Sequence, residues 1–332
     1  IIIDLNKGEI IMKMRRLGSQ GLLVSEMGLG CMGMDHGYGH SVEIKERIKL
    51  IDKAIELGCN LFDTAPIYGF ENEELLGTAL SKHRESVIIA TKFGVTGMEN
   101  IDGQLVPVLD SSPASVRKQL EGSLDRLKTD YIDLFYQHRV DPAVEPEMVA
   151  GLMKELIAEG KIKYWGLSNA PASYIRRAHA VCPVTAVEDQ YSMMWRKPEQ
   201  DLFTVCDELD IGFMAYSPLG NGFLSGQVTA DTTYGEGDYR GMMGRFKPEV
   251  MENNQALLNL IADIAERNTA TSAQVVLAWE LAQKPYIVPI PGTTKLHRLE
   301  ENFNAAKVQL SDAELDDINA ALARLDIDET FF

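Results

Sequence analysis

The chain of 332 residues has no apolar run long enough to cross a bilayer, for which about 20 consecutive apolar residues are needed. The stretch from Ile1 to Asp4 has neither the basic start nor the small-residue cleavage site of a secretory signal. We therefore expect a cytoplasmic protein without a membrane partner.

Cysteine is scarce as well, since the chain has only Cys31, Cys59, Cys182 and Cys206. None of them forms a CxxC pair, and no Cys/His cluster has the spacing of a zinc site. The sequence therefore predicts free, mostly buried thiols in a reducing compartment, and no metal site.

The chain has fewer basic than acidic residues, with 32 Lys+Arg against 49 Asp+Glu and a formal net charge of −17. This excess of negative charge argues against a nucleic-acid backbone or an anionic membrane as partner. A small phosphorylated ligand stays possible because it needs only a local cluster of cations. The hydrophobic share of 45% is ordinary and can fill a large core.

What the chain does have is a regular alternation of short apolar runs and longer amphipathic segments. The strand-like runs lie near 27–31, 60–63, 86–91, 131–137, 163–168, 184–188, 211–216 and 286–289. The helical patterns lie near 43–57, 71–82, 113–128, 146–159, 172–181, 198–208, 271–283 and 295–307. Eight strand–helix units without a dividing linker predict an α/β fold, a (β/α)8 TIM barrel, as a single domain over 14–332. Residues 1–13 are interpreted as an extension or upstream sequence.

Four segments depart from the simple repeat. We expect a small hairpin over 14–24 that caps the barrel bottom, and an extra helix over 250–267. A C-terminal helix over 311–324 is predicted because Ser311 and Glu314 have the spacing of a capping box. The Gly-rich stretch 217–249, after the seventh strand, predicts a long loop, and loops of that length are usually functional.

The segment Gly28-Leu29-Gly30-Cys31-Met32-Gly33 matches the GxGxxG pattern of dinucleotide-binding doubly wound folds. That pattern requires a helix to begin at once, whereas residues 34–39 have the composition of a loop. No strand-end acid follows about 20 residues later. The glycines are better interpreted as allowing the first strand and its loop to approach a ligand closely.

Four ionisable residues in the first half of the chain follow predicted strands. Asp63 and Tyr68 come at and after the second strand, Lys92 lies at the end of the third, and His138 follows the fourth. The carboxyl ends of parallel strands form one rim of a barrel, where α/β enzymes build their active sites. The sequence therefore places four proton-handling groups on one rim.

Together these side chains suit the protonation of an oxygen on which negative charge develops, as when hydride adds to a carbonyl. An ammonium at Lys92 is expected to lower the pKa of Tyr68 by stabilising the phenolate, with Asp63 holding Lys92 in place. His138 could donate a hydrogen bond to a substrate oxygen. Each residue alone also has a structural interpretation, as a helix cap, a packing group or a solvated charge.

These residues lie in segments that resemble those of the aldo-keto reductases. The segments are, in chain order, Asp63-Thr64-Ala65, Tyr68-Gly69, Thr91-Lys92-Phe93-Gly94, Gln137-His138, Gly166-Leu167-Ser168-Asn169, Gln190-Tyr191-Ser192, Ala215-Tyr216-Ser217-Pro218-Leu219-Gly220, Ile290-Pro291-Gly292-Thr293-Thr294-Lys295 and Glu301-Asn302. The resemblance implies a (β/α)8 barrel and a hydride-transferring oxidoreductase that uses NADP(H). In it Tyr68 would be the general acid, Lys92 and Asp63 would tune it, and His138 would orient the carbonyl.

The resemblance also implies a set of residues that hold the cofactor. Side chains at three strand ends would bind the nicotinamide carboxamide, an aromatic ring would stack on the nicotinamide, and the start of the long loop would line the pyrophosphate. The residues assigned to the cofactor are Met32, Gly33, Ser168, Asn169, Gln190, Tyr216, Ser217, Leu219, Gly220, Asn221, Thr293, Lys295, Arg298, Glu301 and Asn302.

Lys295 and Arg298 lie three residues apart at the start of the last predicted barrel helix. Taken alone, they are typical of a solvated helix face. Two cations, the Thr293 hydroxyl and a helix N-terminus also suit a 2′-phosphate, and the resembling family uses this region for one. NADPH is therefore favoured over NADH, with Glu301 and Asn302 facing the adenine.

The sequence indicates the substrate less clearly than the cofactor. Residues that could contact it mix apolar and aromatic groups and favour a small carbonyl compound with a hydrophobic body: Met32, Asp35, His36, Tyr38, Phe93, Arg139, Trp195 and Phe223. Residues 137–142 resemble microbial and plant members that reduce varied aldehydes. Two alternatives to a reductase are a cofactor-binding, redox-sensing regulatory subunit and a barrel lyase or isomerase, and the latter has no use for the cofactor motifs. The oligomeric state is not predicted.

Overall fold

The computed structural model describes residues 12–39, 42–101, 104–229 and 231–330. Eight parallel strands form one sheet in the order of their appearance along the chain. They are β3 (Leu29–Gly30), β4 (Leu61–Asp63), β5 (Ile88–Phe93), β8 (Ile132–Gln137), β9 (Ile162–Ser168), β10 (Ala186–Gln190), β11 (Gly212–Tyr216) and β12 (Ile287–Pro289). The amides of Gly28 and Gly30 donate to the carbonyls of Pro289 and Pro291, at 3.0 and 3.4 Å, and join the first strand to the last. The predicted (β/α)8 barrel is confirmed.

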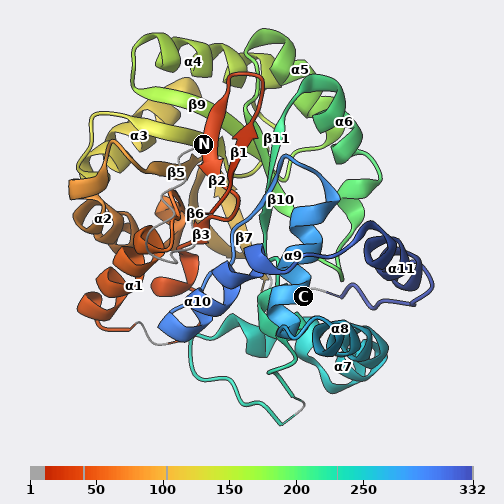
Figure 1. Cartoon of the computed structure of the whole chain (residues 1–332). Coiled ribbons are helices and arrows are strands. Elements are labelled where there is room, and N and C mark those ends of the chain that lie inside the picture. The colour runs from red at the N-terminus through yellow and green to blue at the C-terminus, as the bar shows by residue number, and fades with distance from the viewer. Residues whose placement is uncertain (1–11, 40–41, 102–103, 230, 331–332) are drawn as a thin grey trace, which may run out of the picture.

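Each barrel strand leads into a helix on the outside of the sheet, and the helices surround the strands in Figure 1. The eight helices are α1 (Ile44–Glu56), α2 (Phe70–Ala79), α3 (Pro113–Leu127), α4 (Pro146–Ala158), α5 (Ala172–Val181), α6 (Leu202–Leu209), α9 (Ser272–Gln283) and α10 (Leu296–Phe303). In α3, Pro113 takes the first helical position, where its missing N–H is not needed, and Val116, Leu120, Leu124 and Leu127 form the buried face. The helical patterns in the sequence are therefore confirmed.

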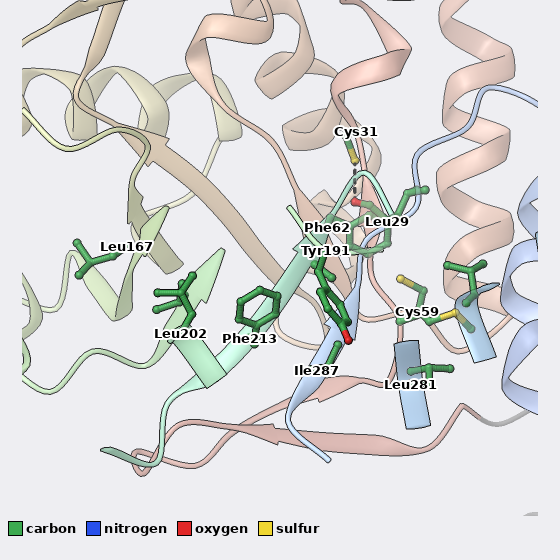
Figure 2. Packing of buried hydrophobic residues seen from close by; sticks show 14 of the residues in the cluster. Leu29, Cys31, Cys59, Phe62, Leu167, Tyr191, Leu202, Phe213, Leu281 and Ile287 are labelled. Atoms are coloured by element: carbon green, nitrogen blue, oxygen red, sulfur yellow. Dashed lines mark hydrogen bonds between the residues drawn. The ribbon is translucent and has the colours of Figure 1, made fainter. Parts of the chain in front are cut away.

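The hydrophobic core has two layers. The larger layer lies between the barrel and its helices, where Phe62, Tyr191 and Phe213 pack with aliphatic side chains (Figure 2). The smaller layer fills the barrel and includes Leu61, Ala90, Leu134, Ala186, Met214 and Val288. Burial of this apolar surface is the main favourable term in folding and fixes the strands that carry the site.

A hairpin closes the amino end of the barrel, as predicted. Strands β1 (Met14–Leu17) and β2 (Leu22–Ser25) pair antiparallel and lie across the barrel end in Figure 1. Leu17, Leu22 and Val24 join the interior layer. At Gly212, the first residue of β11, an added Cβ would meet Leu17 at 2.4 Å, so no larger residue fits there. The carboxyl ends of the strands are therefore the open rim.

Two segments differ from the prediction. The expected helix 250–267 is two helices, α7 (Pro248–Asn253) and α8 (Gln255–Arg267), because Asn254 interrupts it and exchanges hydrogen bonds of 3.0 Å with the backbone of Asp328. An unpredicted hairpin follows β5, formed by β6 (Val95–Ile101) and β7 (Gln104–Leu109). Most of β6 is exposed, so it has no alternation of buried and exposed residues to reveal it.

The predicted C-terminal helix is α11 (Asp312–Leu322), and Ser311 and Glu314 form the expected capping box. The early glycines have a structural role that the sequence interpretation did not include. An added Cβ at Gly30 would lie 2.7 Å from the Ile290 carbonyl oxygen, and one at Gly28 would meet Leu61. Glycine is therefore needed where the first and last strands meet, and the approach of a ligand to this segment stays a prediction.

No helix in the described ranges has the length and apolar character of a membrane span. The assignment of one domain to 14–332 stays a prediction. Residues 1–11 of the predicted extension lie outside the described residues.

Candidate active site

The four predicted catalytic residues lie together on the open rim. Asp63 is the last residue of β4, Lys92 belongs to β5, and His138 directly follows β8. Tyr68 ends the short 3-10 turn η2 (Pro66–Tyr68) that follows β4. The rings of Tyr68 and His138 meet edge to face with centroids 5.9 Å apart. The structure therefore brings together the residues that the sequence predicted to meet.

Lys92 is the centre of this group and is fully buried. Its Nζ donates to both carboxylate oxygens of Asp63 at 2.7 Å and to the Thr64 carbonyl at 3.1 Å. The same Nζ lies 3.4 Å from the Tyr68 hydroxyl oxygen. Burial lowers the pKa of Lys92, but the charges of Asp63 and Glu188 outweigh burial and raise it, so the ammonium is kept. A fixed positive charge therefore lies beside the Tyr68 oxygen.

Glu188, on β10, also contacts Lys92 and was not predicted. Its Oε1 is 3.3 Å from Nζ, and the side chain is only 4% exposed. Burial and the charge of Asp63 raise the pKa of Glu188 to about 8, although Lys92 opposes them. Its signal in the sequence was an acid within a buried strand, in register with Ala186 and Gln190, which share its face.

Tyr68 and His138 are both in their neutral forms. Burial raises the pKa of Tyr68, although the charge of Lys92 opposes this. Lys92 therefore lowers the pKa of Tyr68 as expected, but the cost of burying a phenolate is larger, so the net shift is upward. Burial, with the charges of Lys92 and Arg139, holds the pKa of His138 well below its ordinary value. His138 has a neutral imidazole, which still donates one hydrogen bond.

The residues predicted to hold the nicotinamide end three neighbouring strands. Ser168 ends β9, Gln190 ends β10 and Tyr216 ends β11. Asn169 follows β9 with a left-handed φ of 53°, donates to the Ser168 hydroxyl at 2.7 Å and accepts from the Tyr216 hydroxyl at 2.8 Å. The buried Nε2 of Gln190 has no partner among the described residues. The rim beside Lys92 therefore carries a connected polar group and one unused amide donor.

The long segment 217–249 crosses the rim to the connection after β3. Ser217, Gly220 and Asn221 at its start all have positive φ, and Leu219 lies among them. Asn221 donates to the Tyr38 hydroxyl at 2.9 Å and accepts from the buried Arg245 at 3.0 Å. Further along, the Tyr239 amide donates to the Gly37 carbonyl at 2.9 Å. The predicted loop is therefore held across the rim, close to Tyr68.

The predicted phosphate region lies after β12. Lys295 caps α10, its amide donates to the Thr293 hydroxyl at 3.1 Å, and Arg298 follows in the first turn. The side chains of Lys295 and Arg298 are exposed and form no ion pair with any residue that the structure describes. Glu301 is half-buried and Asn302 is buried. Two exposed cations thus lie at the N-terminus of α10, and their role toward a phosphate stays a prediction.

The residues suggested for the substrate do not all reach the rim. His36 stacks on Tyr68 with ring centroids 6.2 Å apart and packs edge to face on Tyr239 at 5.1 Å. Phe93 and Phe223 are buried in the core instead, and Asp35 is used in an ion pair with Arg47. Met32 and Gly33 form the short turn η1 (Met32–Met34) just before His36. The ring–ring contacts of Tyr68 among the described residues are therefore those with His36 and His138.

Similarity to known proteins agrees with this geometry. A family model described as Aldo/keto reductase family matches residues 26–323. The chain is 41% identical over 309 residues to a probable aldo-keto reductase 1 of Glycine max. The matched region covers 92% of this chain and 88% of that protein.

Two solved structures extend the similarity to the fold. A glycerol dehydrogenase, AKR11B4 from Gluconobacter oxydans, superimposes with a TM-score of 0.84 and 26% identity, covering 96% of this chain and 98% of that chain. The holo form of the aldo-keto reductase AKR11C1 from Bacillus halodurans gives a TM-score of 0.76 and 26% identity over the same shares.

Proposed function

This chain belongs to the aldo/keto reductase family and is an oxidoreductase; from that premise we propose that it reduces an aldehyde or ketone to an alcohol with NADPH. The observation that carries the proposal is the buried ammonium of Lys92 beside the Tyr68 hydroxyl, on a rim that also holds a neutral His138. The reaction needs a proton donor for the carbonyl oxygen and a hydrogen-bond donor that orients it.

In this proposal Tyr68 is the general acid. Its raised pKa keeps the proton on the hydroxyl at neutral pH. As negative charge grows on the carbonyl oxygen, the proton moves from Tyr68 to that oxygen, and the Lys92 ammonium stabilises the phenolate left behind. Asp63 holds Lys92 in position through two hydrogen bonds. His138 donates to the same carbonyl oxygen and fixes its orientation.

The described residues fit a nicotinamide dinucleotide. When bound, NADPH supplies the hydride that adds to the carbonyl carbon. The unpartnered Nε2 of Gln190 and the Ser168–Asn169 pair suit a carboxamide, which both donates and accepts. Tyr216 offers an aromatic face for a planar ring. Segment 217–249 would cover the pyrophosphate, with Ser217, Leu219, Gly220 and Asn221 against it.

The choice of NADPH over NADH rests on Lys295 and Arg298. An exposed pair of cations without an ion pair in the described part, at a helix N-terminus, suits a phosphate dianion. The hydroxyl of Thr293, which accepts from the Lys295 amide at 3.1 Å, would also contact the phosphate, and Glu301 and Asn302 would face the adenine. We also place the protein in the cytoplasm, which the four free and buried cysteines support.

A panel of aldehydes, ketones and sugars, each tested for substrate-dependent NADPH oxidation, tests the proposal. We expect turnover with at least one aldehyde of hydrophobic character and much weaker turnover with NADH. A protein that binds NADPH tightly but oxidises it with no carbonyl compound in the panel contradicts the proposal. That outcome favours a redox-sensing regulatory subunit.

A further inference from the structure

Two carboxyl groups share one ammonium in the barrel interior. Lys92 Nζ lies 2.7 Å from both oxygens of Asp63 and 3.3 Å from Oε1 of Glu188. The exposed fractions of the Lys92, Asp63 and Glu188 side chains are 0%, 4% and 4%. The second oxygen of Glu188, Oε2, is buried and has no hydrogen-bond partner among the described residues. Glu188 therefore lies beside Lys92 without being fully paired.

The surroundings of Glu188 contain one positive charge and several acidic groups. The titratable groups that interact electrostatically with it come from the neighbouring elements: Asp63 on β4, Tyr68 on η2, Lys92 on β5, Tyr136 on β8 and Tyr216 on β11. The Tyr136 hydroxyl donates its hydrogen bond to the Met214 sulfur, at 2.9 Å, and not to Glu188. Lys92 is thus the only cation in this set.

Charge balance decides which form these groups adopt. Two ionised carboxylates beside one ammonium would leave a net negative charge in a buried region, which is costly. One proton on the carboxyl pair removes that charge. Asp63 has the closer, two-oxygen contact with Lys92, so the proton belongs on Glu188. The direction of the Glu188 pKa agrees, because burial and Asp63 both raise it and Lys92 lowers it less.

We propose that Glu188 is a positioning residue that holds a proton at neutral pH. In this neutral form it does not compete for the charge of Lys92, which then pairs with Asp63 and stabilises the Tyr68 phenolate. Glu188 acts through Lys92, and the proposal rests on the reductase function proposed above. When Glu188 releases its proton to water, the new negative charge makes the Tyr68 phenolate less stable. Tyr68 then becomes a weaker acid, and reduction slows as pH rises through the titration of Glu188.

The first test is the pH profile of kcat for the variant Glu188→Gln. The amide has the shape of the neutral carboxylic acid but cannot ionise. We expect the ratio of kcat at pH 9 to kcat at pH 7 to rise by about threefold to tenfold over the wild-type ratio, because about 90% of a group with a pKa near 8 is ionised at pH 9. An unchanged ratio overturns the proposal.

Glu280 provides the matched control. It is also fully buried, on α9, and burial raises the pKa of this carboxyl too, but no hydrogen bond to its oxygens is formed in the described part of the chain. The variant Glu280→Gln removes a buried carboxyl that lies away from Lys92. We expect its kcat ratio to equal that of the wild type, so a rise in both variants also contradicts a specific role for Glu188.

The second test does not depend on activity. Infrared absorption of the wild type should contain a carboxylic acid C=O band that disappears near pH 8, and Glu280→Gln should keep that band. Glu188→Gln, where it folds, should lack it. Absence of a titrating band in the wild type overturns the proposal. If the protein reduces no carbonyl compound, the reductase proposal fails, while this titration still decides whether Glu188 holds a proton.

Discussion

The two ends of the predicted ligand site differ in how far their charges are already paired. At the catalytic end, Lys92 is buried between Asp63 and Glu188. At the phosphate end, Lys295 and Arg298 are exposed and have no ion-pair partner among the described residues. Both ends lie on the same rim of the barrel, but they rest on different elements, strands in the first case and a helix start in the second.

This difference follows from what each end must do. Stabilising a transition state requires charges that are already in place and screened from water, because reorientation during the reaction would cost free energy. Holding a charged ligand requires charges that are free to meet it. A substitution at the catalytic end should therefore change the chemical step or the fold, and one at the phosphate end should change cofactor affinity.

The variant Tyr68→Phe should cause the largest loss. Removing the proton donor should lower kcat by about a thousandfold, in the range that general acid catalysis supplies. NADPH affinity, measured by fluorescence titration, should stay within about twofold, because the ring and its packing on His36 are kept. The control is Tyr131→Phe, next to Arg84 at the closed end of the barrel. Near wild-type turnover in Tyr68→Phe would show that another group donates the proton.

The variant Lys92→Met tests whether the buried charges of the catalytic end also stabilise the fold. It leaves Asp63 buried without its cation, and breaking a buried pair in this way costs about 3–5 kcal/mol. Urea unfolding should show this loss at pH 7 and a smaller loss at pH 5, where Asp63 can take up a proton because burial raises its pKa. The control, Lys163→Met, removes a half-exposed partner of Asp133 and should cost less than about 1 kcal/mol. An equal, small cost for both variants would contradict the account.

The double variant Lys295→Ala with Arg298→Ala tests the phosphate end. Losing two charged hydrogen-bond donors should raise the KM for NADPH by about tenfold to a hundredfold and leave that for NADH within about twofold. The difference should shrink at high salt because exposed charges are screened. Lys118→Ala with Lys154→Ala, on α3 and α4, makes the same change in net charge elsewhere on the surface. Equal weakening of both cofactors would refute the 2′-phosphate assignment.

The smallest predicted effect concerns the loop that joins the two ends. Tyr38→Phe removes the hydrogen bond that Asn221 donates across the rim, worth about 1 kcal/mol. Stopped-flow release of NADPH should become about fivefold faster. Tyr286→Phe, which removes a hydrogen bond to the Phe203 carbonyl near the closed end, serves as control. Unchanged release in Tyr38→Phe would mean that this contact does not hold the loop over the cofactor.

The barrel could be predicted because its physical signals are local. Buried parallel strands are short apolar runs, and their helices have one apolar face, as in Val116, Leu120, Leu124 and Leu127. No residue of β6 is buried, so this strand left no such signal. The break at Asn254 depends on a contact with Asp328, 74 residues away, which no local pattern contains.

The candidate site was predicted only in part, for the same reason. Strand ends place Asp63, Lys92 and His138 on one rim whatever the details of packing. The lowering of the Tyr68 pKa by Lys92 was expected, but the net rise was not, because it depends on how completely the ring is buried, which the sequence does not reveal. Glu188 was missed because its role requires a neighbour on a different strand.

The central claim is that the Tyr68–Lys92 end of the rim protonates a carbonyl oxygen opposite a hydride donor. The most direct test is a reaction with NADPH carrying deuterium at the transferred C4 position, followed by mass spectrometry of the alcohol. The account predicts one deuterium on the former carbonyl carbon in the wild type and almost no labelled alcohol in Tyr68→Phe with NADPH bound. Bound NADPH without labelled alcohol from any carbonyl compound in the wild type would contradict it.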